Sequence, residues 1–118
     1  METAQFDARV RRRDGVSVIE LAGEIAGPAE EALEAAYAEA GDAPAILLEF
    51  SRVGYINSTG IALIVGVLAK ARARRQEVTA SGLSDHYREI FEITRLADFM
   101  TLYPDEESAL EKTTEGRK

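Results

Sequence analysis

Apolar residues occupy every second position from Phe6 to Val10, and the other residues of the stretch 6–12 are charged. A period of two predicts a β-strand with one solvated face. Residues 13–15 then supply an Asp-Gly pair typical of a tight hairpin turn, and residues 16–21 supply a second strand rich in β-branched side chains. We therefore expect the chain to begin with two antiparallel strands.

The rest of the chain alternates between helical and strand patterns. Residues 22–27 interrupt the strand pattern, and Pro28 suits the first turn of a helix over residues 28–40, which ends before Gly41. Residues 45–50 form a nearly continuous apolar run, typical of a strand buried on both faces. The elements predicted after it are a helix over residues 58–75, a strand over 78–80, a helix over 85–94, a strand over 99–102 and a helix over 105–112.

This order of elements predicts an α/β fold. We expect a mostly parallel sheet of about five strands with an antiparallel first strand, packed with about four helices. A single domain accounts for residues 1–118, with its core over about residues 6–112 and a flexible tail over residues 113–118.

Two further expectations concern the helices and the loops. The first half of the helix over residues 58–75 is apolar on every side, which predicts that it is deeply buried. Tyr87 and Phe91, one helical turn apart, are expected to pack in the core. Functional sites in parallel sheets gather beyond the carboxyl ends of the strands, so we expect the loops at residues 23–27 and 57–60 to lie side by side.

Composition excludes several classes of function. The chain has 118 residues, a formal net charge of −7, no cysteine and one histidine, His86, which is expected to face solvent. The negative charge opposes binding to nucleic acid, and the lack of cysteine excludes disulfides and thiolate metal sites. No metal, cofactor or catalytic residue is expected, because the sequence contains no metal-ligand, phosphate-loop or nucleophile–base motif. We expect a binding protein rather than an enzyme.

The sequence also lacks signals for a membrane. Its longest apolar run covers residues 61–69, about half of the ~20 residues that span a bilayer. The first residues are polar and acidic, without the apolar core of a signal peptide. We therefore expect a cytoplasmic protein that does not insert into a membrane. The sequence leaves the oligomeric state open.

A polar group, Asn57-Ser58-Thr59-Gly60, directly precedes the most apolar run of the chain. Asn and Ser both favour the N-cap of a helix, and anions are stabilised at that end by free N–H groups and the helix dipole. A phosphate on Ser58 would be stabilised locally, which makes Ser58 a candidate switch. The alternative is that Ser58 is only a helix cap. Thr59 is the neighbouring hydroxyl, and Gly60 permits a close approach of backbone or partner.

Four segments carry a resemblance to a known family. They are residues 21–25 (LAGEI), 55–63 (YINSTGIAL), 91–96 (FEITRL) and 102–110 (LYPDEESAL). In this order and spacing they resemble the STAS domain of bacterial anti-sigma-factor antagonists, over about residues 6–112.

The resemblance implies a partner, an anti-sigma factor that usually has ATP-dependent serine kinase activity. The unphosphorylated antagonist binds it and frees the sigma factor, and phosphorylation of a serine at the start of the second helix dissociates the complex. That serine corresponds to Ser58, with Thr59 as the alternative acceptor. The implied partner-binding residues are Glu24, Ile25, Ala26, Gly27, Asn57, Ser58, Thr59, Gly60, Ile61 and Leu63.

The sequence departs from the family pattern at two positions. Asn57 stands where the family usually has Asp before the phosphorylated serine, and Ala26 stands where it often has Asp. Both changes remove a carboxylate from one surface, so they either tune the switch or abolish it. Two alternatives stay open, a STAS scaffold that binds constitutively and a regulatory STAS subunit of a membrane transporter. Glu24 is either a docking residue or an ordinary exposed acid.

Overall fold

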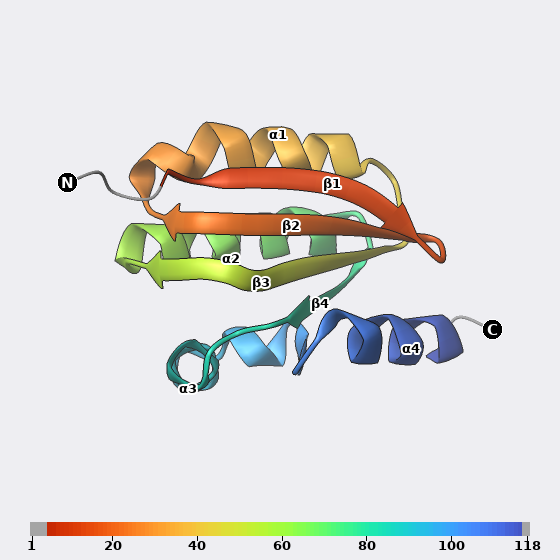
Figure 1. Ribbon diagram of the computed structural model, residues 1–118. Helices are drawn as coiled ribbons and strands as arrows, with labels where there is room; N and C mark the ends of the chain where they lie inside the picture. Colours follow the sequence, from red (N-terminus) through yellow and green to blue (C-terminus); the bar gives the residue numbers. More distant parts are fainter. Residues whose placement is uncertain (1–4, 117–118) are drawn as a thin grey trace.

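Residues 5–116 are described by a computed structural model, in which helices and strands alternate after an initial hairpin (Figure 1). The strands are β1 (Asp7–Arg13), β2 (Val16–Ile25), β3 (Ala45–Ile56), β4 (Glu77–Ser81) and β5 (Thr101–Tyr103). The α-helices are α1 (Glu30–Ala40), α2 (Ser58–Ala73), α3 (Asp85–Ile93) and α4 (Glu106–Gly116), joined by the short 3-10 helices η1 (Gly27–Ala29) and η2 (Leu96–Asp98). The elements follow one another in the predicted order.

The strands form one sheet in the order β1-β2-β3-β4-β5. β1 pairs antiparallel with β2 across a turn at Asp14 and Gly15, whose φ angles of 52° and 81° are typical of a tight hairpin. All other neighbouring strands pair parallel. The predicted fold, a mostly parallel sheet with an antiparallel first strand, is confirmed.

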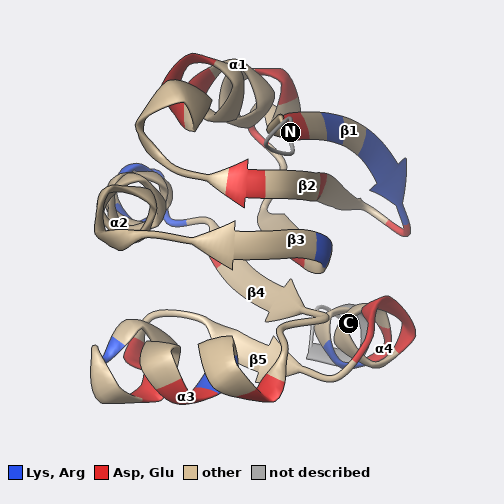
Figure 2. Ribbon diagram, turned by 60° about the vertical axis from the view of Figure 1, so that its left-hand side comes forward, with Lys and Arg blue, Asp and Glu red and all other residues tan. Residues whose placement is uncertain are grey.

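Helices cover both faces of the sheet and divide the core in two. Helices α1, α2 and α3 pack on one face, in a cluster of buried residues that includes Ile19, Leu48 and Phe91. Helix α4 packs on the other face, in a smaller cluster that includes Leu47 and Leu110. Figure 2 shows α2 and α4 on opposite sides of the sheet. Successive residues of β3 therefore face different helices, which explains why its first half is apolar at every position except Glu49.

Two strands extend well beyond their predicted ends. β2 continues to Ile25, through residues expected to interrupt it, and β3 continues to Ile56 instead of ending at Phe50. The two extensions pair with each other, with register irregularities before Ala22 and after Gly23. Gly23 has a φ of 91°, a conformation that favours glycine. The glycine that suggested the end of the strand instead forms an irregularity within it.

Helix α2 corrects a second prediction, because its apolar first half is not buried on every side. Ile64, Val67 and Leu68 are buried, but Val65 is 47% exposed and Gly66 is also exposed. Helices α1 and α3 lie on either side of α2 and leave its outer surface uncovered (Figure 2). The apolar character of α2 therefore exceeds what the core requires.

Helix α4 extends beyond its predicted end at Lys112. It continues to Gly116. Thr113, part of the predicted flexible tail, is buried, and its hydroxyl donates a 2.8 Å hydrogen bond to the Ala109 carbonyl. Residues 117–118 of the predicted tail lie outside the described residues. The ordered helix is thus longer than its charge-rich sequence suggests.

A group of charged residues joins α4 to the edge strand β1. Arg11 donates to both carboxylate oxygens of Glu106, at 2.7 and 2.8 Å, and to Glu20 at 3.0 Å. Arg13 donates to Glu106 and Glu107, each at 2.8 Å. The hydrogen bonds from Arg11 are the main reason that the pKa of Glu106 is lowered to about 2, against the opposing effect of partial burial. These contacts fix the start of α4 against the sheet.

Candidate functional site

The ends of β2 and β3 meet at the predicted site. Ile25 and Ile56 are paired in the sheet, and the Asn57 N–H donates a 3.2 Å hydrogen bond to the Ile25 carbonyl. The start of α2 packs on the same group, because a Cβ added at Gly60 would overlap with the Ile25 oxygen and lie 2.7 Å from its carbonyl carbon. Glycine is therefore required at this point of close approach. The expectation that the two loops lie side by side is confirmed.

Asn57, rather than Ser58, caps helix α2. The Asn57 Oδ1 accepts a 2.8 Å hydrogen bond from the Gly60 N–H. Ser58 is the first residue of the helix and is exposed, and its hydroxyl makes no hydrogen bond to another group within residues 5–116. The alternative that Ser58 serves only as the helix cap is therefore wrong. Its hydroxyl lies at the amino end of a helix, where negative charge is favoured.

The predicted partner-binding residues differ in accessibility. Gly27, Ser58 and Thr59 are exposed, whereas Ile25 and Gly60 are buried. The partly buried members are Glu24, Ala26, Asn57, Ile61 and Leu63. Ile25 is fully buried in the core and Gly60 is buried beneath the start of α2, so the accessible part of this surface is formed by the other predicted residues.

Tyr87 of α3 supports this site, although the sequence predicts it only as a core residue. Its side chain is buried, like that of Phe91, and its hydroxyl accepts a 2.9 Å hydrogen bond from the Ile56 N–H. Ile56 directly precedes the Asn57 cap. The exposed His86 ring packs edge to face on Tyr87, with the ring centroids 4.8 Å apart. Helical periodicity locates Tyr87 in the core but carries no signal for a hydrogen bond between residues 31 positions apart.

The site offers little chemistry of its own. A hollow of about 330 Å³ adjoins Glu24 and Ala26. Within residues 5–116, no group of three or more His, Cys, Asp or Glu side chains is placed to hold a metal ion. No helix in that part of the chain has the length and apolar character needed to cross a membrane. What the site does present is an accessible hydroxyl, that of Ser58, on a surface built from two loops.

Comparison with known proteins identifies the family. A family model described as "Mlab, STAS domain" matches residues 8–103. An anti-sigma-B factor antagonist of Listeria monocytogenes is 34% identical over 101 residues, which cover 82% of this chain and 86% of the relative. The chain belongs to the STAS family of anti-sigma-factor antagonists. The resemblance carried by the four sequence segments is thereby confirmed.

Solved structures agree with the fold of this STAS domain. An anti-sigma factor antagonist from Mycobacterium paratuberculosis has a TM-score of 0.79 and 26% sequence identity, and the match covers 92% of this chain and 93% of that one. The Bacillus cell fate determinant SpoIIAA in its phosphorylated form has a TM-score of 0.69 at 24% identity, covering 92% and 99% of the two chains. The second likeness concerns the fold alone.

Proposed function

We propose that this STAS domain is an anti-sigma-factor antagonist that binds an anti-sigma factor through the accessible parts of residues 24–27 and 57–63. Phosphorylation of Ser58 by the partner's kinase activity would end the complex. The similarity to the Listeria antagonist supports the class of partner. The close contact between Gly60 and Ile25 supports the location, because it brings both loops onto one surface.

The observation that carries the proposal is the accessibility of the Ser58 hydroxyl. Asn57 supplies the helix cap, so modification of Ser58 removes no hydrogen bond that holds α2. A phosphate adds about −1.5 to −2 charges, and free N–H groups stabilise it at the first turn of a helix. Phosphorylation would therefore leave the fold intact and act on the partner, by adding charge and bulk to the docking surface.

Asn57 and Ala26 bear on the phosphorylated state. With no carboxylate at either position, a phosphate on Ser58 meets less repulsion from its own chain. Glu24 remains as a partly buried acid at this surface. We propose that the two replacements tune the stability of the phosphorylated form and leave phosphorylation itself possible.

Phosphate mapping tests the acceptor residue. The purified chain is incubated with ATP and a lysate of its native cell, and the tryptic peptide of residues 53–70 is analysed by mass spectrometry. Stoichiometric phosphate on Ser58 is the expected result. Ser58→Ala and Thr59→Ala variants, treated in parallel, assign the site, and phosphate on Thr59 alone would move the acceptor by one residue.

Binding of a Ser58→Asp variant to the anti-sigma factor tests release. Asp at the first helical position is favoured by the helix dipole, so the variant is expected to be as stable as the parent protein. It should bind about tenfold more weakly or worse, whereas Ser58→Ala should bind like the parent. Equal binding by Ser58→Asp would contradict the switch. Binding to the partner that is the same with and without ATP would favour the constitutive scaffold. Co-purification with a permease would favour the transporter subunit.

A further inference from the structure

The carboxyl-terminal half of α2 borders a surface that the proposed function does not use. This surface, here called the Arg72 groove, is lined chiefly by Val65, Leu68, Arg72, Arg75, Val78 and Phe99. We infer that the Arg72 groove is a docking site for an acidic, amphipathic segment of a second protein partner. The inference goes beyond the proposed contact with an anti-sigma factor and does not depend on it.

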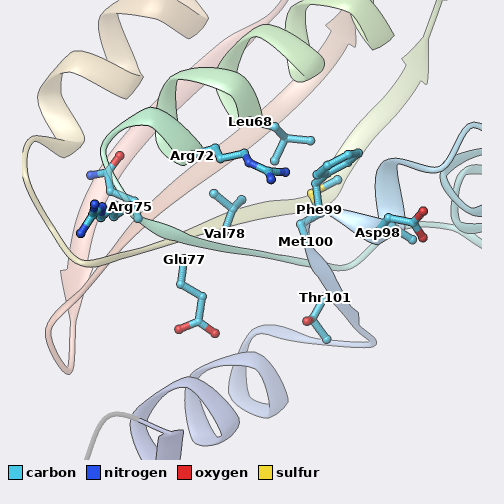
Figure 3. Close-up of a pocket in the computed structure, with 11 residues that line it drawn as sticks. Leu68, Arg72, Arg75, Glu77, Val78, Asp98, Phe99, Met100 and Thr101 are labelled. Carbon is cyan, nitrogen blue, oxygen red and sulfur yellow. The ribbon is translucent and has the colours of Figure 1, made fainter.

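The Arg72 groove consists of two hollows that share a ridge. One hollow, of about 400 Å³, borders the first residues of β4, and the other, of about 360 Å³, lies between α2 and η2. Leu68, Arg72 and Phe99 line both hollows. Figure 3 shows Arg72 reaching from α2 toward Phe99, above Val78 of β4. A segment lying across this ridge would place one apolar side chain in each hollow.

Apolar side chains in the Arg72 groove are unusually accessible. Phe99 is 55% exposed and Val65 is 47% exposed, although both are large apolar residues. Leu68 and Val78 are almost fully buried, with exposed fractions of 7% and 6%, and line the base of the larger hollow. Single exposed apolar residues are common, whereas two that line the same hollow favour a surface that another molecule covers.

The charges in the groove indicate an acidic partner. The chain has a net charge of −7, yet Arg72 and Arg75 make no ion pair with a carboxylate of residues 5–116. Asp98, at the edge of the groove, is held by Arg95 at 2.6 Å. Glu77 also lines the larger hollow, but its side chain points toward α4 and away from Arg72 (Figure 3). Two arginines are thus left to receive carboxylates from outside the chain.

Arg72 is oriented to receive such a carboxylate. Its guanidinium carbon lies 5.6 Å from the centroid of the Phe99 ring, in a cation–π contact. A guanidinium stacked on a ring keeps the N–H donors along its edge available for a bidentate bond to Asp or Glu. Nucleic acid and anionic lipid fit less well, because both require a more extended basic surface than two arginines in an acidic chain provide.

The groove and Ser58 lie near opposite ends of one helix. At about 1.5 Å per residue along α2, the backbones of Ser58 and Arg72 are roughly 21 Å apart. A segment bound in the Arg72 groove therefore leaves the Ser58 surface accessible. The full chain is expected to bind both partners at once, with or without phosphate on Ser58.

Peptide selection identifies the chemistry that the groove prefers. Random linear peptides displayed on phage are selected on the full chain, and enriched peptides are synthesised. They are expected to carry apolar residues flanked by Asp or Glu, and to shift the amide resonances of Val65, Leu68 and Phe99 rather than that of Ser58. Arg72→Glu should weaken their binding about tenfold or more. Arg88→Glu, the same charge change on the exposed side of α3, should change it less than about twofold.

Several outcomes would overturn the inference. They are a failure to enrich any peptide, enriched peptides without acidic residues, and peptides whose shifts map to the Ser58 end of α2. A Phe99→Ser variant, checked for an unchanged unfolding temperature, supplies a second loss of binding that does not depend on charge. If the same resonances shift with the concentration of the chain alone, a second copy occupies the groove and the acidic-partner inference is likewise wrong.

Discussion

Gly60 lies against the carbonyl group of Ile25 with no space for a side chain between them. The contact joins the first turn of α2 to the end of β2, and it brings the Ser58 hydroxyl and the loop after β2 onto one surface. The geometry of the site therefore depends on a residue that carries no functional group. Because the obstacle is backbone, a larger residue at position 60 can be accommodated only by movement of the helix or the strand.

Replacement of Gly60 by Ala is expected to lower the free energy of unfolding by about 1–3 kcal/mol, as overpacking does elsewhere. Gly66→Ala is the matched control, since Gly66 lies in the same helix with open space around it. That substitution should raise stability by about 0.5–1 kcal/mol, because glycine disfavours a helix interior. Denaturant titrations measure the free energy of unfolding of both variants. A stabilising effect at both positions would show that helix propensity outweighs the contact with Ile25.

Asn57 and Ser58 are expected to contribute differently to stability. Asn57→Ala removes the bond to the Gly60 N–H and should lower stability by about 1 kcal/mol, whereas Asn57→Asp keeps the cap and should be nearly neutral. Ser58→Ala should change stability by less than about 0.5 kcal/mol, as surface substitutions usually do. Thermal unfolding of the three variants provides the comparison. A loss at Ser58 as large as that at Asn57 would contradict the assignment of the cap.

Tyr87→Phe tests the support that α3 gives to the site. The variant leaves the Ile56 N–H without its partner and should lower stability by about 1–2 kcal/mol. Hydrogen exchange at the Ile56 amide should accelerate by more than the loss of global stability alone would cause, because the end of β3 opens more easily. Tyr55→Phe serves as the control, since Tyr55 is 50% exposed. Unchanged exchange at Ile56 would show that the hydroxyl does not hold the strand.

Glu106 makes stability depend on pH in the acid range. Its pKa falls from 4.5 in an unconstrained chain to about 2, so its contribution is complete above about pH 4.5 and is lost as the pH decreases toward 2. With allowance for solvent screening, that contribution is on the order of 2 kcal/mol. Denaturant titrations of Glu106→Gln should show lower stability at neutral pH and a weaker decline between about pH 5 and pH 2.

Glu107→Gln is the control for that experiment. The Glu107 side chain is 77% exposed and contacts Arg13 alone among the described basic residues. The Glu107→Gln substitution should change the free energy of unfolding by less than about 1 kcal/mol. If Glu106→Gln and the parent protein lost stability in parallel as the pH is lowered, the ion pairs with Arg11 would have no part in the acid response.

The local patterns of the sequence were sufficient to predict the order of the elements and the type of sheet. Alternation over the first strand and the apolar run over the third depend on neighbouring residues, and both elements are found. The extensions of β2 to Ile25 and of β3 to Ile56 were not predictable, because each extension is stabilised by the other across the sheet. Arg11 and Glu106 are likewise 95 positions apart, and no pattern in the sequence pairs them.

The meeting of the two loops on one surface was predicted from the sequence, but the structural roles of the residues at the start of α2 were not. Asn57 and Ser58 are both good cap residues, and propensity does not distinguish them. The choice is made by the sheet: Ile56 is paired with Ile25, so the chain leaves the strand at Asn57 and the helix begins at Ser58. Burial of Ile25 follows from the same extension, which turns an expected loop residue into part of the core.

Capping by Asn57 has a consequence for how this surface can change during evolution. The fold depends on Asn57, through its bond to the helix, and on Gly60, through its lack of a side chain. Ser58 has neither of these structural roles. Under the proposed function, one substitution at Ser58 is therefore enough to gain or lose control by phosphorylation while the fold stays intact. The proposed signalling role and the maintenance of the native state thus fall to different, adjacent residues.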